Sequence, residues 1–112
     1  MSAVVVNLNG KRFLRECLDS LLGQSWPQVE VILVDNASTD GSGEEARAHF
    51  GERIRFLGNA RNEGFARANN QAFALARGEW VFLLNNDAVV EPSAVERLMT
   101  FVEGKPHVGM LA

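Results

Sequence analysis

Short clusters of amides and carboxylates follow three apolar runs of the sequence. The clusters are Asn7 with Asn9, Asp35 with Asn36, and Asn85 with Asn86 and Asp87. Such side chains hydrogen-bond to polar ligands, and carboxylates bind divalent cations. Because Asn, Asp and Gly also make good turns after strands, each cluster taken alone is explained more simply as a turn. In an open parallel sheet, however, all strand ends of one kind lie along one edge, so three clusters together favour a ligand site there.

Asp87 is the predicted metal ligand. It follows the apolar run 81–84 and two asparagines. A carboxylate at such a strand end can hold Mg²⁺ or Mn²⁺ while the phosphates of a nucleoside diphosphate complete the coordination shell. The alternative is that Asp87 caps the next turn or helix. Pro92 and Ser93 already supply a start for that helix, so the metal role is favoured.

The sequence predicts a role or a hydrogen-bond partner for three other polar residues. Asp35 ends the apolar run 31–34, where its carboxylate can accept hydrogen bonds from a nucleobase imide or a ribose hydroxyl. Asp40 precedes Gly41 and a predicted helix, so N-capping is its expected role. Asn69 falls on the apolar stripe of another predicted helix. A buried amide needs partners, and nearby backbone groups are the simplest candidates.

Several familiar signatures are absent or incomplete. Gly41, Gly43 and Ala46 have the spacing of a dinucleotide fingerprint, but residues 35–40 separate them from the preceding strand. The stretch 35–46 lacks the ligands of a calcium-binding EF-hand loop at its third, fifth and twelfth positions. The sequence has no Gly-Lys-Ser/Thr phosphate loop, and a single cysteine excludes a cysteine-pair zinc site.

The elements that must position these residues alternate between strands and helices. Apolar runs predict strands at 3–6, 29–34, 53–57, 80–84 and 108–111, the first, second and fourth of them covered on both faces. Apolar residues at three- and four-residue steps predict helices at 12–23, 41–50, 64–76 and 93–102. Short connections imply right-handed crossovers and a mainly parallel sheet. The predicted class is α/β, a three-layer α/β/α arrangement in one domain over residues 1–112.

The composition excludes several classes of protein. The 112 residues include 11 Lys and Arg against 14 Asp and Glu, and the net charge of -3 gives no electrostatic basis for nucleic-acid binding. The hydrophobic content of 46% fits a folded core, and one cysteine excludes an internal disulfide. No apolar run approaches the roughly 18 residues of a membrane span, and no targeting segment is visible, so a cytoplasmic protein is expected.

Four motifs in order resemble glycosyltransferase family 2, the inverting nucleotide-sugar transferases with the GT-A fold. They are VVVNLNG, VILVDNASTDGS, NEGFARANNQAF and GEWVFLLNNDA. The resemblance covers nearly all of the chain and corresponds to the N-terminal, donor-binding half of such an enzyme. It implies that Asn7 and Asp35 lie at the base and ribose of the nucleotide, with Asn62 near the same pocket. Asn85 and Asp87 fall on the outer positions of the family's Asp-x-Asp motif, whose last aspartate binds a divalent metal and the diphosphate.

Two positions depart from the family pattern. Asn85 stands where the family has an acidic residue, which leaves one carboxylate for Mg²⁺ or Mn²⁺, and Leu8 stands where an aromatic ring often stacks on the base. The motifs are most similar to the rhamnosyltransferase-like branch, which implies a dTDP- or UDP-linked sugar donor. The implied acceptor is a hydroxyl of a glycan, of a lipid-linked molecule or of another compound, as in polysaccharide biosynthesis.

The resemblance places the family's catalytic base in the later half, so no catalytic residue is assigned in this chain. The chain alone is expected to bind the donor without transferring sugar. A nucleotidyltransferase and a non-catalytic, self-associating nucleotide-binding module remain as alternatives. Because a sheet without its neighbours exposes an edge and apolar faces, a homodimer of a truncated chain is expected. Membrane association of a longer form is left open.

Overall fold

The structure, a computed structural model, describes residues 1–111. Strands and helices alternate along the chain, with one short 3-10 helix, η1. In order they are β1 (Ser2–Asn7), α1 (Leu14–Leu22), β2 (Glu30–Asp35), α2 (Ser42–Phe50), η1 (Gly51–Arg53), β3 (Arg55–Gly58), α3 (Phe65–Leu75), β4 (Val81–Leu83) and α4 (Ala94–Val102). Each helix predicted from the sequence is present, beginning one or two residues later than predicted and ending at the predicted residue or one residue before it.

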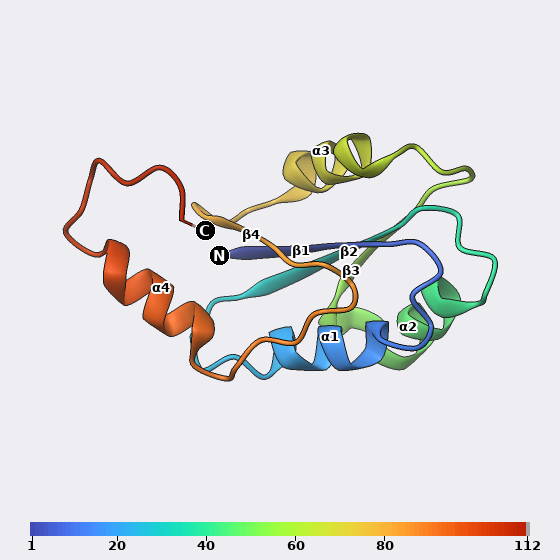
Figure 1. The fold of residues 1–112 in the computed structure, drawn as a ribbon, viewed down its shortest axis with the longest axis horizontal. Coiled ribbons are helices and arrows are strands. Elements are labelled where there is room, and N and C mark those ends of the chain that lie inside the picture. The colour runs from blue at the N-terminus through green and yellow to red at the C-terminus, as the bar shows by residue number, and fades with distance from the viewer. Residues whose placement is uncertain (112) are drawn as a thin grey trace.

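The four strands form one parallel sheet in the order β3-β2-β1-β4. Helices α1 and α2 lie on one face of the sheet and α3 lies on the other (Figure 1). The steps from β1 to β2 and from β2 to β3 each cross over through a helix, as parallel pairing requires. The predicted α/β class and three-layer arrangement are confirmed.

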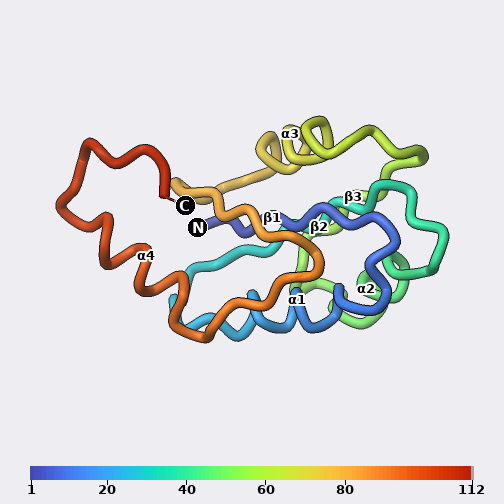
Figure 2. Tube along the Cα trace, in the orientation of Figure 1, coloured from blue at the N-terminus to red at the C-terminus, as the bar shows by residue number. Residues whose placement is uncertain are grey.

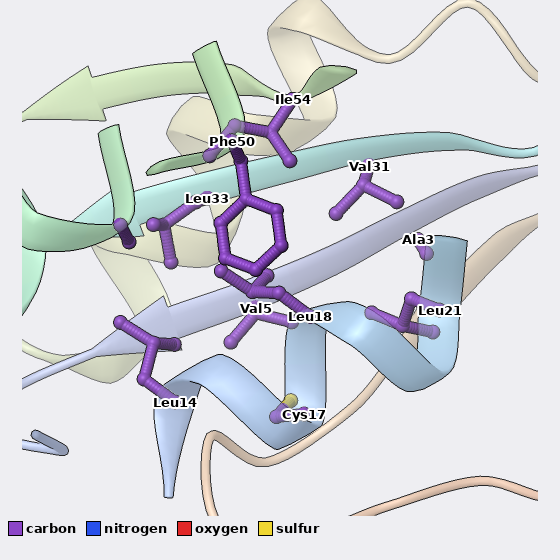
Figure 3. Packing of buried hydrophobic residues seen from close by; sticks show 11 residues of the cluster. Ala3, Val5, Leu14, Cys17, Leu18, Leu21, Val31, Leu33, Phe50 and Ile54 are labelled. Atoms are coloured by element: carbon purple, nitrogen blue, oxygen red, sulfur yellow. The ribbon is translucent and has the colours of Figure 1, made fainter. Parts of the chain in front are cut away.

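The larger core fills the space between the sheet and helices α1 and α2 (Figure 3). Helix α1 turns its buried side chains toward the sheet at three- and four-residue steps, and these side chains are Leu14, Cys17, Leu18 and Leu21. On the opposite face, Ala68 and Ala72 of α3 pack against Val4, Ile32 and Val34. The small alanines let α3 approach the sheet closely. Packing in the two cores holds the strands in place, and with them the strand ends where the polar clusters lie.

Two expectations about the last strands are wrong. The strand at 80–84 was expected to be covered on both faces, yet β4 is an edge strand whose Val81 and Leu83 are 40% and 49% exposed. The reason is that β4 pairs only with β1, over three residues. The predicted strand at 108–111 is not formed, because this segment pairs with no strand of the described sheet.

Self-association of the chain stays a prediction.

In the part of the chain that the structure describes, no helix has the length and hydrophobicity needed to cross a membrane.

Candidate functional site

The carboxyl ends of three neighbouring strands lie level with one another. In the parallel register, Asn7 of β1 pairs with Asp35 of β2, and Asp35 pairs with Gly58 of β3. The pairing continues one residue further, because Asn36 N–H donates to Asn7 O and Asn59 N–H donates to Asp35 O, both at 2.8 Å. The loops after these strands gather at the right-hand edge of the molecule in Figures 1 and 2. The structure therefore brings Asn7 and Asp35 together, as the strand pattern predicts.

The side chain of Asn7 is the centre of this edge, and it is fully buried. Its Nδ2 donates to Asp35 Oδ1 at 2.8 Å, to Ser42 Oγ at 2.8 Å and to Ser38 Oγ at 3.1 Å. An amide nitrogen has two N–H groups, so its donor capacity is fully used. Asn7 thereby ties the end of β1 to the end of β2 and to the start of α2.

The carboxylate of Asp35 is held beneath the first turn of α2. The residue Asp35 as a whole is 8% exposed. Besides Asn7, Ser38 bonds to it twice, through Oγ to Oδ1 at 2.7 Å and through N–H to Oδ2 at 3.1 Å. Gly43 in α2 makes room for it, since a Cβ there would lie 2.7 Å from each carboxylate oxygen. The helix N-terminus also favours a negative charge. Oδ2, with one donor, keeps the capacity to accept another hydrogen bond.

An open cleft of about 660 Å³ lies beside Asp35. Its walls come from the loop after β2, from the first turns of α2 and from the end of β3 and the loop after it. Arg47 of α2 and Phe56 of β3 both line it, and the Arg47 guanidinium lies 5.3 Å from the centre of the Phe56 ring. The volume falls in the range of about 300–1,000 Å³ that is typical of small-molecule sites.

The segment after β4 is a tight turn. Ala88 N–H donates to Asn85 O at 3.0 Å, so Asn86 and Asp87 occupy the central positions. Asn86 Nδ2 donates to Asn7 Oδ1 at 2.9 Å, which anchors the turn on the buried edge. The side chains of Asn85 and Asp87 are exposed, whereas Asn86 is half-buried. The three polar clusters thus meet, and Asn86 makes the connection.

Cys17 of α1 lies next to this turn. The thiol is buried, and it donates a hydrogen bond to Asn85 O at 3.4 Å. Burial raises the pKa of Cys17 to about 12, and the negative charge of Asp87 adds to the shift. Cys17 is therefore a protonated donor at neutral pH, which is the form that the bond to Asn85 needs.

Asp87 offers a single carboxylate to a metal ion. Within residues 1–111, no three side chains of the metal-binding types His, Cys, Asp and Glu lie together. Mg²⁺ in proteins commonly uses one or two carboxylates and takes its remaining ligands from water and from substrate phosphates. The residues present therefore fit a divalent metal as part of a complex with a diphosphate, and they do not form a closed protein cage.

Asn62 lies outside the buried network. Its side chain is exposed, and its Oδ1 accepts the N–H of Gly64 at 2.9 Å, which closes a local turn. The loop around it is nevertheless tied to the end of β2. Asn36 accepts the N–H of Glu63 at 3.0 Å and donates to Gly64 O at 3.2 Å. A nucleotide contact by Asn62 stays a prediction.

Two further expectations concern helix turns. The carboxylate of Asp40 accepts Ser42 N–H at 2.9 Å and Lys11 N–H at 3.0 Å, so it caps α2 from one residue before the N-cap glycine. These bonds, those from Ser42 above all, lower the pKa of Asp40. Asn69 is buried and donates to Phe65 O one helical turn earlier at 3.0 Å. The simpler expectation, a backbone partner, is correct for Asn69.

Sequence reasoning placed Asn86 in a polar cluster, but it did not predict the hydrogen bonds of four residues that build the site. They are Gly10, Ser38, Ser42 and Asn86. Ser38 carries a local signal, because a serine three residues after an aspartate can close a turn through its hydroxyl. Ser42 and Asn86 have no such signal, since their bonds to Asn7 join residues 35 and 79 positions apart. Gly10 bonds to Asn7 only three residues earlier, but the space that it leaves for Asn86 depends on the tertiary structure.

Comparison with known proteins identifies the family. A family model for glycosyl transferase family 2 matches residues 2–112. The chain belongs to glycosyl transferase family 2. This confirms the resemblance drawn from the four motifs, and it favours a glycosyltransferase over the nucleotidyltransferase alternative.

The chain is shorter than the family members that it matches. It is 35% identical over 107 residues to the glycosyltransferase GlyG of Streptococcus pneumoniae, a match that covers 94% of this chain and 36% of that protein. It is 32% identical over 98 residues to a chondroitin synthase of Escherichia coli, which covers 86% of this chain and 14% of the synthase. The chain therefore spans about a third of the length of GlyG and a smaller part of the chondroitin synthase.

Solved glycosyltransferase structures share the fold. The mannosyltransferase PcManGT of Pyrobaculum calidifontis, in complex with GDP-Man and Mn²⁺, superposes with a TM-score of 0.86 at 28% identity, over 96% of this chain and 33% of that one. TarS 1-349 of S. aureus, in complex with UDP-GlcNAc, has a TM-score of 0.83 at 24% identity, over 92% of this chain and 31% of that one. The predicted GT-A topology is confirmed.

Proposed function

We propose that this chain is the donor-binding part of an inverting family 2 glycosyltransferase and binds a nucleoside diphosphate sugar with a divalent metal. The observation that carries the proposal is that two carboxylate-bearing segments are tied to one buried amide, that of Asn7, at one sheet edge. Asp35 lines the cleft at the end of β2, and Asp87 is presented by the turn that Asn86 anchors to the same edge. Complexes of similar structures with UDP-GlcNAc and with GDP-Man and Mn²⁺ support a ligand of this class.

Asp35 is proposed to bind the base. Its Oδ2 has one hydrogen-bond donor in the structure, and Asp35 lines the cleft, so this oxygen is proposed to accept an imide N–H. Uracil and thymine carry such a group, and guanine carries a comparable ring N–H at N1. The sequence motifs favour UDP or dTDP, and the GDP-Man complex of PcManGT makes GDP the third nucleotide to test.

Asp87 is proposed to bind the metal and, through it, the diphosphate. A bound Mg²⁺ or Mn²⁺ would neutralise the charge that develops on the departing nucleoside diphosphate. Asn85, also exposed on this turn, can donate a hydrogen bond to a phosphate oxygen from its side-chain amide. Leaving-group stabilisation is thus the contribution of this turn to catalysis.

The proposed reaction is a single displacement. The acceptor oxygen forms a bond to the anomeric carbon as the bond from that carbon to the diphosphate oxygen breaks, and the acceptor proton passes to a base. Attack opposite to the leaving group inverts the configuration. We assign the base to none of the described carboxylates, so the proposed role of this chain is donor binding.

The experiment is calorimetric titration of the chain with UDP, dTDP, GDP and NAD, each with and without Mn²⁺. Metal-dependent binding of one nucleoside diphosphate, lost in Asp87→Ala, is expected. Asn70→Ala is the matched control, because Asn70 is exposed on α3. Binding of no nucleotide, or binding that Asp87→Ala leaves unchanged, would count against the proposal.

A further inference from the structure

We infer that the side chains of Asn7 and Asn86 form a positioning joint that sets where Asp87 stands relative to Asp35. This inference rests on the proposed function, in which Asp35 binds the base and Asp87 the metal. Asn7 bonds to Asp35 through its Nδ2 and to Asn86 through its Oδ1. One rigid, planar amide therefore contacts both halves of the site.

The joint has no hydrogen-bonding capacity left for a ligand on the Asn7 side. Asn7 Oδ1 accepts from Asn86 Nδ2 at 2.9 Å and from Gly10 N–H at 3.2 Å, which fills both lone pairs. Its Nδ2 is engaged with three oxygen atoms. A group that is fully buried and fully paired in this way acts on a donor through its neighbours, so the role of Asn7 is to hold Asp35 and Asn86.

Strand register explains why Asn86 makes the bond. Val4 of β1 pairs with Leu83 of β4. If the same parallel register is continued three residues along both strands, Asn7 stands level with Asn86. The exposed and half-buried positions alternate from Val81 to Asn86, so Asn86 turns inward while Asn85 remains exposed.

Gly10 provides the space that the joint occupies. A Cβ on Gly10 would lie 2.5 Å from Asn7 Oδ1 and 3.1 Å from Asn86 Cγ, both closer than ordinary contact. Substitution of Gly10 therefore disturbs the joint while both amides remain in the sequence. This gives a second way to perturb it, independent of removing an asparagine.

The ligand-free protein tests the joint itself. In a nitrogen-15 NMR exchange experiment, the side-chain NH₂ of Asn86 should exchange with water about tenfold more slowly than that of exposed Asn70, because it is bonded to Asn7. Equal rates for Asn86 and Asn70 would overturn the inference. This result depends on neither nucleotide nor metal, so it stands apart from the fate of the proposed function.

The positioning role is tested by the metal dependence of nucleotide binding. For Asn86→Ala, we expect the metal-free Kd of the nucleotide to change less than about threefold, while the gain in affinity from Mn²⁺ falls about tenfold. Gly10→Ala should give the same pattern, and it serves if Asn86→Ala does not fold. Asn70→Ala should match the wild type. An unchanged Mn²⁺ gain in folded Asn86→Ala or Gly10→Ala would overturn the inference, whereas a wild type that binds no nucleotide would instead overturn the proposed function.

Discussion

Gly43→Ala is the most demanding test of the site geometry, because it adds a single methyl group next to Asp35. The new Cβ would lie 2.7 Å from each carboxylate oxygen, about 0.7 Å short of the 3.4 Å at which ordinary contact begins. Asp35 cannot move freely, because Asn7 and Ser38 hold it. Either the carboxylate or the first turn of α2 must therefore shift.

The expected magnitudes follow from two opposing effects. Overpacking of this kind costs about 1–3 kcal/mol of the free energy of unfolding, and the better helix propensity of alanine returns up to about 1 kcal/mol. Displacing Asp35 from the base costs a charge-assisted hydrogen bond of about 1.5–3 kcal/mol, which corresponds to a loss of nucleotide affinity of about tenfold or more. The loss of affinity should therefore be the clearer of the two effects.

The assay combines thermal unfolding with calorimetric titration of the nucleotide that the wild type binds. Gly109→Ala is the control, because a Cβ there meets nothing within 4 Å. We expect the control to match the wild type in both measurements. A Gly43→Ala protein that is more stable than the wild type and binds the nucleotide equally well would refute the placement of Asp35 beneath α2.

Three further outcomes are expected. Because burial raises the pKa of Cys17 to about 12, the native protein at pH 8 should react with iodoacetamide far more slowly than the urea-unfolded chain, and equal rates would contradict the burial. Hydrogen bonds, chiefly those from Ser42, lower the folded-state pKa of Asp40 below its ordinary 3.8. The charged carboxylate therefore stabilises the folded protein fully above pH 3.8. This stabilisation is lost as the pH falls through the folded-state pKa. The stability difference between wild type and Asp40→Asn in urea unfolding should accordingly shrink from pH 7 to pH 3. Leu8 is 44% exposed, and Leu8→Tyr should raise nucleotide affinity by up to about tenfold through base stacking, which titration of the Leu8→Ala variant alongside would control.

Local patterns in the sequence predict much of the fold. The three- and four-residue steps of α1 and the continuous apolar runs of β1 and β2 each arise within one segment, so periodicity alone finds these elements. The apolar run at 108–111 was predicted to be a strand in the same way and is not one, because an apolar run becomes a strand only when it has a partner. The exposure of Val81 and Leu83 likewise depends on what lies beside β4, which no local pattern records.

The sequence by itself determined that Asp35 and Asp87 follow apolar strands, and parallel topology then placed both at one sheet edge. Only the tertiary structure decided which neighbours hold them. The bond between Asn7 and Asn86 joins residues 79 positions apart, and the contact of Gly43 with Asp35 depends on how α2 docks against the sheet. Register and docking are set by the packing of both cores together. A sequence pattern reports which residues end a strand, whereas the distances between those ends arise only when the strands are packed side by side.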